Sequence, residues 1–137
     1  MNVKALNLAE LILILLFGAT AAQGQLAVTV SPPKVTGNKA VVSLELKNTF
    51  KEKVESARAV CFLLDEQGKI VGQATQWVIG GTKDKPPLAA DAKTTFNLII
   101  PMDKVTNTNL TAKVSLNRII LEGGKVGDPQ KDFELIK

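Results

Sequence analysis

The sequence predicts an all-β protein built as an antiparallel sandwich of two sheets. Two alternating apolar runs, AVVSLELKN at residues 40–48 and ARAVCFLLD at 57–65, flank a polar connection. The second run ends in the turn DEQGK and the chain resumes as IVGQATQWVI. This order of elements is typical of an antiparallel sandwich: a strand, a loop, a second strand, a hairpin turn and a third strand. After the first 21 residues no segment has a sustained helical period, which agrees with this prediction.

The first two strands are predicted from their alternation and their turns. A strand over residues 25–31 (QLAVTVS) ends at Pro32-Pro33. Gly37-Asn38 turns the chain into a second strand over residues 40–47. Apolar and polar residues alternate along the second strand, so we expect one of its faces to be solvated.

The next two strands form the predicted hairpin. Both faces of the third strand, residues 54–65, are largely apolar near its end, so we expect it to be central and covered on both sides there. Gly68 stands where a hairpin loop needs a positive φ. The fourth strand covers residues 70–79 and carries Trp77.

The remaining strands follow the longest loop signal, GGTKDKPP at residues 80–87. We predict strands over residues 94–100, 110–121 and, more weakly, 133–136, with a turn at Gly123-Gly124. Residues Phe96, Leu98 and Ile100 are expected to point inward. About seven short strands at this spacing are typical of a sandwich of immunoglobulin or fibronectin type III class, and an open barrel is the alternative.

The N-terminus reads as a secretory signal peptide over residues 1–21. Lys4 supplies a positive charge, residues 11–17 (LILILLF) form an apolar run, and Ala19-Thr20-Ala21 is a small-x-small cleavage pattern. Cleavage is expected after Ala21 or Ala22, and a retained anchor is the alternative. The apolar run is shorter than the about 20 residues that a membrane span needs.

The rest of the chain, residues 22–137, is expected to form a single β-sandwich domain without a stable membrane span. No Cys stands at the expected cleavage edge after the apolar run, so we expect no lipid attachment at the new N-terminus. We therefore expect a periplasmic or secreted protein that is not lipid-anchored.

The charge pattern argues against nucleic acid as a partner. The formal net charge is +4, but nearly all of the basic residues are Lys, scattered singly along the chain. Scattered Lys is typical of a soluble surface and of guarded sheet edges. A nucleic-acid face would gather Arg with aromatic residues, and Arg58 and Arg118 are the only two Arg.

The residue types restrict the possible chemistry. The sequence has no His, which excludes Ser-His-Asp and Cys-His catalysis and the usual imidazole ligands of zinc and copper. The single Cys, Cys61, lies within an apolar run and is interpreted as a small buried hydrophobe. We expect neither a catalytic site nor a cofactor.

The order of these signals resembles the FxLYD-like family of bacterial exported β-sandwich domains, from Leu26 to Ile100. Residues 61–65 (CFLLD) lie over the naming motif, where Leu63 and Asp65 match, Cys61 replaces Phe and Leu64 replaces Tyr. Leu88 and Phe96 match the later landmark, although Asp91-Ala92 stands where Pro-Gly is usual. The resemblance implies a non-catalytic binding or scaffolding module and assigns no functional residue.

Acidic residues are the remaining candidates for chemistry. Asp65 and Glu66 lie in a hairpin turn, where an Asp normally bonds its own backbone. Glu122, Asp128 and Asp132, near flexible glycines, are weak calcium candidates because Ca²⁺ prefers oxygen ligands. The alternative is a solvated terminal hairpin.

Trp77 and the following loop are the candidate contact residues. We favour a core position for Trp77, and an exposed anchor for a sugar or a partner is the alternative. If exposed, Trp77 would form one patch with the loop, which contributes the contact candidates Lys83, Asp84 and Lys85.

Three hypotheses of function follow. The leading one is a non-catalytic exported β-sandwich that binds a protein or another envelope component. The second is a small enzyme or accessory that acts on glycans through carboxylates and Trp77. The third is a structural protein that self-associates by its sheet edges, against which the Lys residues on the strands argue.

Overall fold

The computed structural model describes residues 24–102 and 109–136, and these residues form a β-sandwich. Their strands are β1 (Leu26–Val30), β2 (Lys34–Thr36), β3 (Lys39–Asn48), β4 (Val54–Leu64), β5 (Ile70–Ile79), β6 (Lys93–Pro101), β7 (Thr111–Leu121) and β8 (Phe133–Ile136). A short 3-10 helix, η2 (Glu122–Gly124), follows β7. The predicted all-β fold is confirmed, whereas the predicted signal peptide, with its cleavage edges at Ala21 and Ala22, lies outside the described residues.

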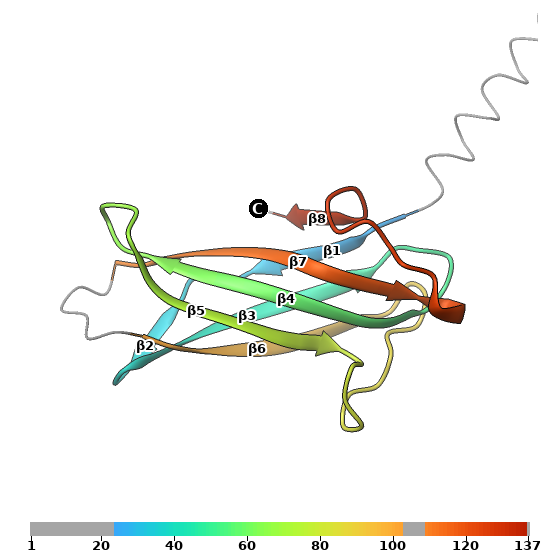
Figure 1. The fold of residues 1–137 in the computed structure, drawn as a ribbon, viewed down its shortest axis with the longest axis horizontal. Helices are drawn as coiled ribbons and strands as arrows, with labels where there is room; N and C mark the ends of the chain where they lie inside the picture. Colours follow the sequence, from blue (N-terminus) through green and yellow to red (C-terminus); the bar gives the residue numbers. More distant parts are fainter. Residues whose placement is uncertain (1–23, 103–108, 137) are drawn as a thin grey trace, which may run out of the picture.

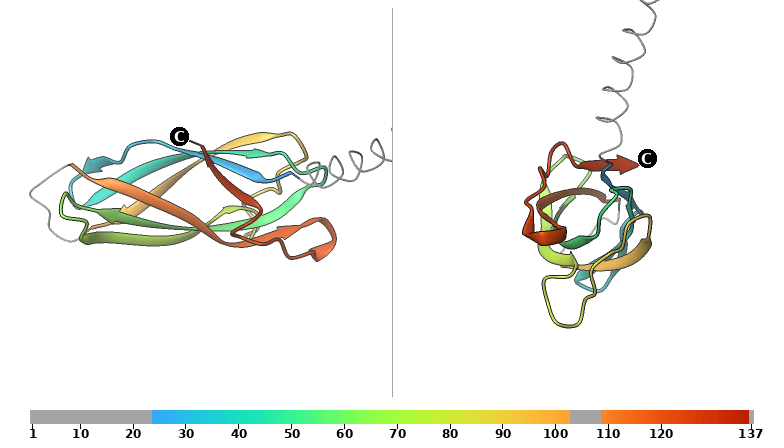
Figure 2. Two further views of the ribbon diagram at one scale, coloured as in Figure 1. Left: turned by 90° about the horizontal axis from the view of Figure 1, so that it is seen from above. Right: turned by 90° about the vertical axis from the view of Figure 1, so that its right-hand side faces the viewer.

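The described strands form two sheets that lie one over the other (Figure 1). In the first sheet, β3 pairs with β6 on one side and with β1 and β2 on the other, and β8 pairs with β1. In the second sheet, the order is β5-β4-β7. The sheets twist together into an elongated body, seen from two further sides in Figure 2.

The core lies between the sheets and is built from alternate residues of the strands. Side chains along β3 are buried at every second position, and those along β4 follow the same rule. This is the period-two pattern that the sequence indicated. The largest fully buried apolar side chains are Leu26, Leu44, Leu46, Leu63, Ile79, Leu98, Ile100 and Ile119.

Strand β4 is central in its sheet, as predicted, but the expectation that both of its faces are covered is wrong. Ala57, Ala59, Cys61 and Leu63 face the core and are fully buried. The other face, Arg58, Val60, Phe62 and Leu64, is only half-buried, because no described element packs over it.

Strand β2 was not predicted. Pro32-Pro33 interrupts the chain after β1, but β2 resumes on the same side of β3, with Lys34 opposite Val41 and Thr36 opposite Lys39. The strand is only three residues long, too short to show a recognisable alternation. The Gly37-Asn38 turn then leads directly into β3.

Strand β8 lies where it was predicted, but it pairs with β1 in parallel, whereas the predicted sandwich was antiparallel. Leu26 stands opposite Phe133 and Val28 opposite Leu135. The chain between β7 and β8 crosses to the other sheet, and the backbone N–H of Leu26 donates to the carbonyl of Asp132 at 2.8 Å. Among the described residues, no helix is long and apolar enough to cross a membrane.

Candidate functional site

Trp77 lies on the outer face of the β5-β4-β7 sheet, so its interpretation as a core residue is wrong. It is half-buried and stands directly opposite Arg58, whose neighbours Ala57 and Ala59 point the other way, into the core. The Arg58 guanidinium lies over the indole ring, with Cζ 5.3 Å from the ring centroid. Arg58 Nε also donates to Asn117 Oδ1 at 2.9 Å, which fixes the guanidinium over the ring.

The loop that follows β5 begins against this indole. A Cβ added at Gly81 would lie 2.2 Å from Trp77 Cδ2, so the glycine backbone is in close contact with the ring. Between Arg58 and Gly81, Trp77 holds the start of the loop against the sheet. The predicted association of Trp77 with the loop is therefore seen, but the indole already has neighbours within the chain.

The other loop candidates lie beyond this contact. Lys83 and Asp84 are exposed, whereas Lys85 is half-buried. The Lys85 ammonium lies 5.0 Å from the centroid of the Phe96 ring on β6, at a distance that allows a cation–π interaction. The loop thus spans from the outer face of β5 to the edge where β5 meets β6.

A hollow of about 450 Å³ lies at that edge. Its apolar wall includes Leu88, Phe96, Pro86 and Pro87, and its basic groups are Lys85 and Lys93. Lys93 Nζ is 3.9 Å from Glu45 Oε2 in a pair that is exposed on both sides, so solvent screens the attraction strongly. We call this feature the loop hollow. Its lining suits a ligand group that is apolar and carries a negative charge.

Asn48 holds the far side of the loop in place. Its side chain is fully buried, and Nδ2 donates to the carbonyls of Leu88 at 3.0 Å, Ala89 at 3.1 Å and Glu52 at 3.0 Å. Its Oδ1 accepts from the backbone N–H of Phe50 at 2.9 Å. Sequence reasoning placed Asn48 at the edge of a polar loop and missed this role.

Both acidic candidates in the hairpin accept hydrogen bonds within the chain. Asp65 Oδ1 accepts from the N–H groups of Gln67 and Lys69, each at 2.9 Å, as expected for an Asp that holds its own turn. Glu66 Oε2 accepts from Asn109 Nδ2 at 3.3 Å. This hairpin lies at the end of the sandwich opposite the loop hollow.

Of the calcium candidates, Asp128 and Asp132 lie in one turn while Glu122 lies in η2. Asp128 Oδ1 accepts from the N–H of Gln130 at 2.9 Å, and Asp132 Oδ2 accepts from the N–H of Asp128 at 2.7 Å. Glu122 Oε1 makes a longer contact, 3.4 Å, with the N–H of Lys53. In residues 24–102 and 109–136, no three acidic or Cys side chains gather as metal ligands would.

Cys61 is part of the core, which confirms its interpretation as a buried hydrophobe. Burial raises the pKa of its thiol to about 11, because the charged thiolate is poorly solvated there. At pH 8 only about one thiol in a thousand is then ionised, and the sulfur is also shielded from solvent.

We therefore expect Cys61 to resist alkylation by iodoacetamide at pH 8 in the folded protein and to react once the protein is unfolded in guanidinium. Mass spectrometry measures the label. The variant Ser115→Cys, at an exposed position of β7, should take up label in the folded state and serves as the control. Rapid labelling of Cys61 in the native protein would contradict its burial.

The chain was compared with known protein families and with curated proteins. No family model matches the chain, and a search of curated proteins finds no match. The resemblance to the FxLYD-like family therefore stays a prediction, and function is argued from the site itself.

Proposed function

We propose that this protein is a non-catalytic exported binding module, which contacts a protein or another envelope component at the end of the sandwich that carries the loop hollow. The observation that carries the proposal is the composition of that hollow. Its wall is largely apolar, and Lys85 and Lys93 are among the residues that line it. A surface group that combines an apolar body with a carboxylate or phosphate would bury its body there and pair its charge with these amines.

The position of the hollow supports the same proposal. Recognition residues are commonly carried by loops that a rigid scaffold positions. Here Asn48 fixes one side of the loop and the contact between Trp77 and Gly81 fixes the other. The predicted signal peptide and the resemblance to the FxLYD-like family agree with an exported binding module, and both remain part of the proposal.

Site-specific crosslinking tests this function. A photoreactive amino acid is placed at Lys83, in the loop, and in a second protein at Gln67, in the hairpin at the opposite end. Both positions are exposed. In envelope extract, we expect a discrete crosslinked product from position 83 and none from position 67. Equal products from both positions would argue against a site at the loop end.

Charge reversal then tests the basic groups. We expect Lys85→Glu to reduce the crosslinked product several-fold, since it replaces attraction by repulsion at the hollow. Lys69→Glu makes the same change of charge in the opposite hairpin and should leave the yield within about twofold, because exposed charges beyond a Debye length are screened. If the two variants behave alike, the hollow is not the contact.

A further inference from the structure

Strand β7 has a free edge. Because β8 pairs with β1, the side of β7 that faces away from β4 has no strand partner in the described chain. Only its end is covered: the carbonyl of Ile119 accepts from Gly127 N–H at 2.8 Å, and the N–H of Leu121 donates to the carbonyl of Lys125 at 2.7 Å. An open edge is a template for another strand.

The backbone direction along this edge follows from those two bonds. Residues of a strand whose side chains share one face send their N–H and C=O groups toward the same edge. Ile119 and Leu121 point their side chains into the core, and their backbone groups point away from β4. Val114 and Leu116, with the half-buried Ala112, share that inward face. Asn117 is an extra, outward residue in the pairing of β7 with β4, so the inward face continues from Ile119 to Leu116 across this bulge. The N–H and C=O groups of Ala112, Val114 and Leu116 therefore point to the free edge.

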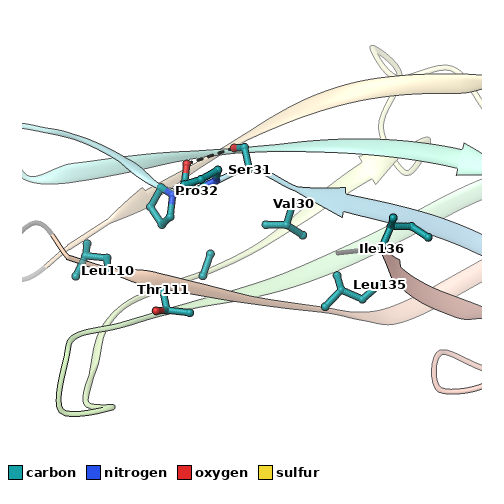
Figure 3. Close-up of a pocket in the computed structure, with 9 residues that line it drawn as sticks. Val30, Ser31, Pro32, Leu110, Thr111, Leu135 and Ile136 are labelled. Carbon is teal, nitrogen blue, oxygen red and sulfur yellow. Dashed lines mark hydrogen bonds between the residues drawn. The ribbon is translucent and has the colours of Figure 1, made fainter.

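An apolar groove runs beside this edge. A hollow of about 340 Å³ lies between the end of β1, the start of β7 and the end of β8. Figure 3 shows side chains that line it. Its apolar lining includes Val30, Pro32, Pro33, Leu110, Leu135 and Ile136. Leu135 is 43% exposed, although it stands opposite the fully buried Val28 in the pairing of β8 with β1. It also lines a second hollow, which includes Phe62 and Lys113 of the outward face. We call the first hollow, on the inward side, the β7 groove.

The outward face of β7 is basic. Lys113 and Arg118 are exposed there, and Arg118 stands opposite Arg58 of β4. Within the described residues, none of these three cations has a carboxylate oxygen within 4.0 Å. A strand added to β7 would therefore lie with one face toward the apolar groove and the other beside unpaired positive charge.

We propose that the free edge of β7 binds an extended segment of a partner protein in which apolar and acidic residues alternate. Its backbone would bond to Ala112, Val114 and Leu116, its apolar side chains would fill the β7 groove, and its carboxylates would lie beside Lys113 and Arg118. Strand addition of this kind takes affinity from main-chain bonds and specificity from alternate side chains. A second copy is disfavoured, because pairing two β7 edges would bring two basic rows together.

The test uses the purified protein and a nine-residue peptide with alternating Val and Glu and blocked ends. We expect binding to slow amide hydrogen exchange at Ala112, Val114 and Leu116 by roughly tenfold or more at saturation. The same peptide with Lys in place of Glu should bind at least several-fold more weakly. Unchanged exchange at these three amides would overturn the proposal.

Peptide N-methylation separates strand addition from contact by side chains alone. Only one alternate set of peptide N–H groups faces β7 in an added strand. Two methylated peptides are compared, one with methyl groups on the Val nitrogens and one with methyl groups on the Glu nitrogens. One of the two should lose binding, and the other should keep it. An equal effect of the two sets would overturn the proposal. This control leaves the protein unchanged, so it does not depend on how a variant folds.

Two protein variants complete the test. Lys113→Glu should weaken binding of the Glu peptide by roughly threefold to tenfold, while Lys83→Glu, in the loop at the other end, should leave it unchanged. Equal effects would overturn the charge argument. Sedimentation of the protein alone should show a monomer. If it shows a dimer whose dissociation constant changes in Lys113→Glu, a second copy occupies the edge and the proposal is overturned. Neither result depends on the loop hollow.

Discussion

Replacing Asn48 by Ala is expected to destabilise the protein by about 3 kcal/mol or more. The change leaves the buried N–H of Phe50 without its present partner. It also removes the Nδ2 donor from the part-buried bonds to the carbonyls of Glu52 and Ala89, while the carbonyl of Leu88 keeps the N–H of Val54. Each unsatisfied buried group costs about 1–3 kcal/mol. Urea denaturation measures the free energy of unfolding, and the midpoint of thermal unfolding should fall by roughly 10 °C or more.

A surface Asn provides the matched control. Asn97 is exposed on β6 and accepts one hydrogen bond, from Ser43 Oγ at 2.7 Å. Asn97→Ala should therefore cost less than about 1 kcal/mol. Asn48→Asp keeps the acceptor for Phe50 but loses the donors, so it should be at least as destabilising as Asn48→Ala. Equal stability losses in the Asn48 and Asn97 variants would show that the buried network contributes little.

The same substitution should also loosen the loop hollow. Leu88 exchanges two backbone hydrogen bonds with Val54, each at 2.9 Å, and its carbonyl also accepts from Asn48. Hydrogen exchange at the amides of Val54 and Leu88 should therefore accelerate in Asn48→Ala more than at the amides of β4 near Cys61. Stability of the core and order of the candidate site are thus linked through one side chain.

Most strands were predictable because the pattern that marks them is local. A side-chain period of two along residues 40–47 or 54–65 needs no knowledge of distant residues. Which strand pairs with which is a different matter. The position of β8 was predicted, but its pairing with β1 depends on how the chain after β7 crosses between the sheets. The free edge of β7 and its groove follow from that pairing, so no sequence signal could indicate them.

Trp77 shows how one irregular residue reverses a prediction. Strict alternation would put Trp77 on the same face as Ile79, which is buried. The register between β4 and β5 shifts by one residue between Ala57–Ile79 and Arg58–Trp77, so Val78 is the extra residue. A bulge of this kind re-aims the side chains beyond it. The indole therefore lies on the outer face, and the sequence carries no mark of the bulge.

The candidate site was predictable only in part, for a similar reason. Lys83, Asp84 and Lys85 could be found because a polar loop between strands is a local feature. Phe96 and Leu88 read as ordinary core positions, and only the fold brings them to the edge of the loop hollow. The buried role of Asn48 depends on Leu88, 40 residues further along the chain. Contacts over such separations are invisible in a single sequence.

Replacing Gly80 by Ala is expected to be the second large effect. Gly80 has φ +53°, and an added Cβ would lie 1.9 Å from the carbonyl oxygen of Glu55. The left-handed conformation alone costs an Ala about 1–2 kcal/mol. The clash is with backbone at the start of β4, so relief requires the loop or the strand to move. We expect a total loss of about 3 kcal/mol or more, measured by urea denaturation.

Gly68 is the control, because it shares the conformation and lacks the contact. Its φ is +80°, and nothing lies within 4 Å of an added Cβ. Gly68→Ala should therefore lose only the about 1–2 kcal/mol that the backbone conformation costs. Trp77, the only Trp, provides a second measurement, since its emission should change in Gly80→Ala, where the loop moves, and not in Gly68→Ala. Equal stability losses and equal spectra in the two variants would mean that the close approach of Gly80 to Glu55 does not hold the loop.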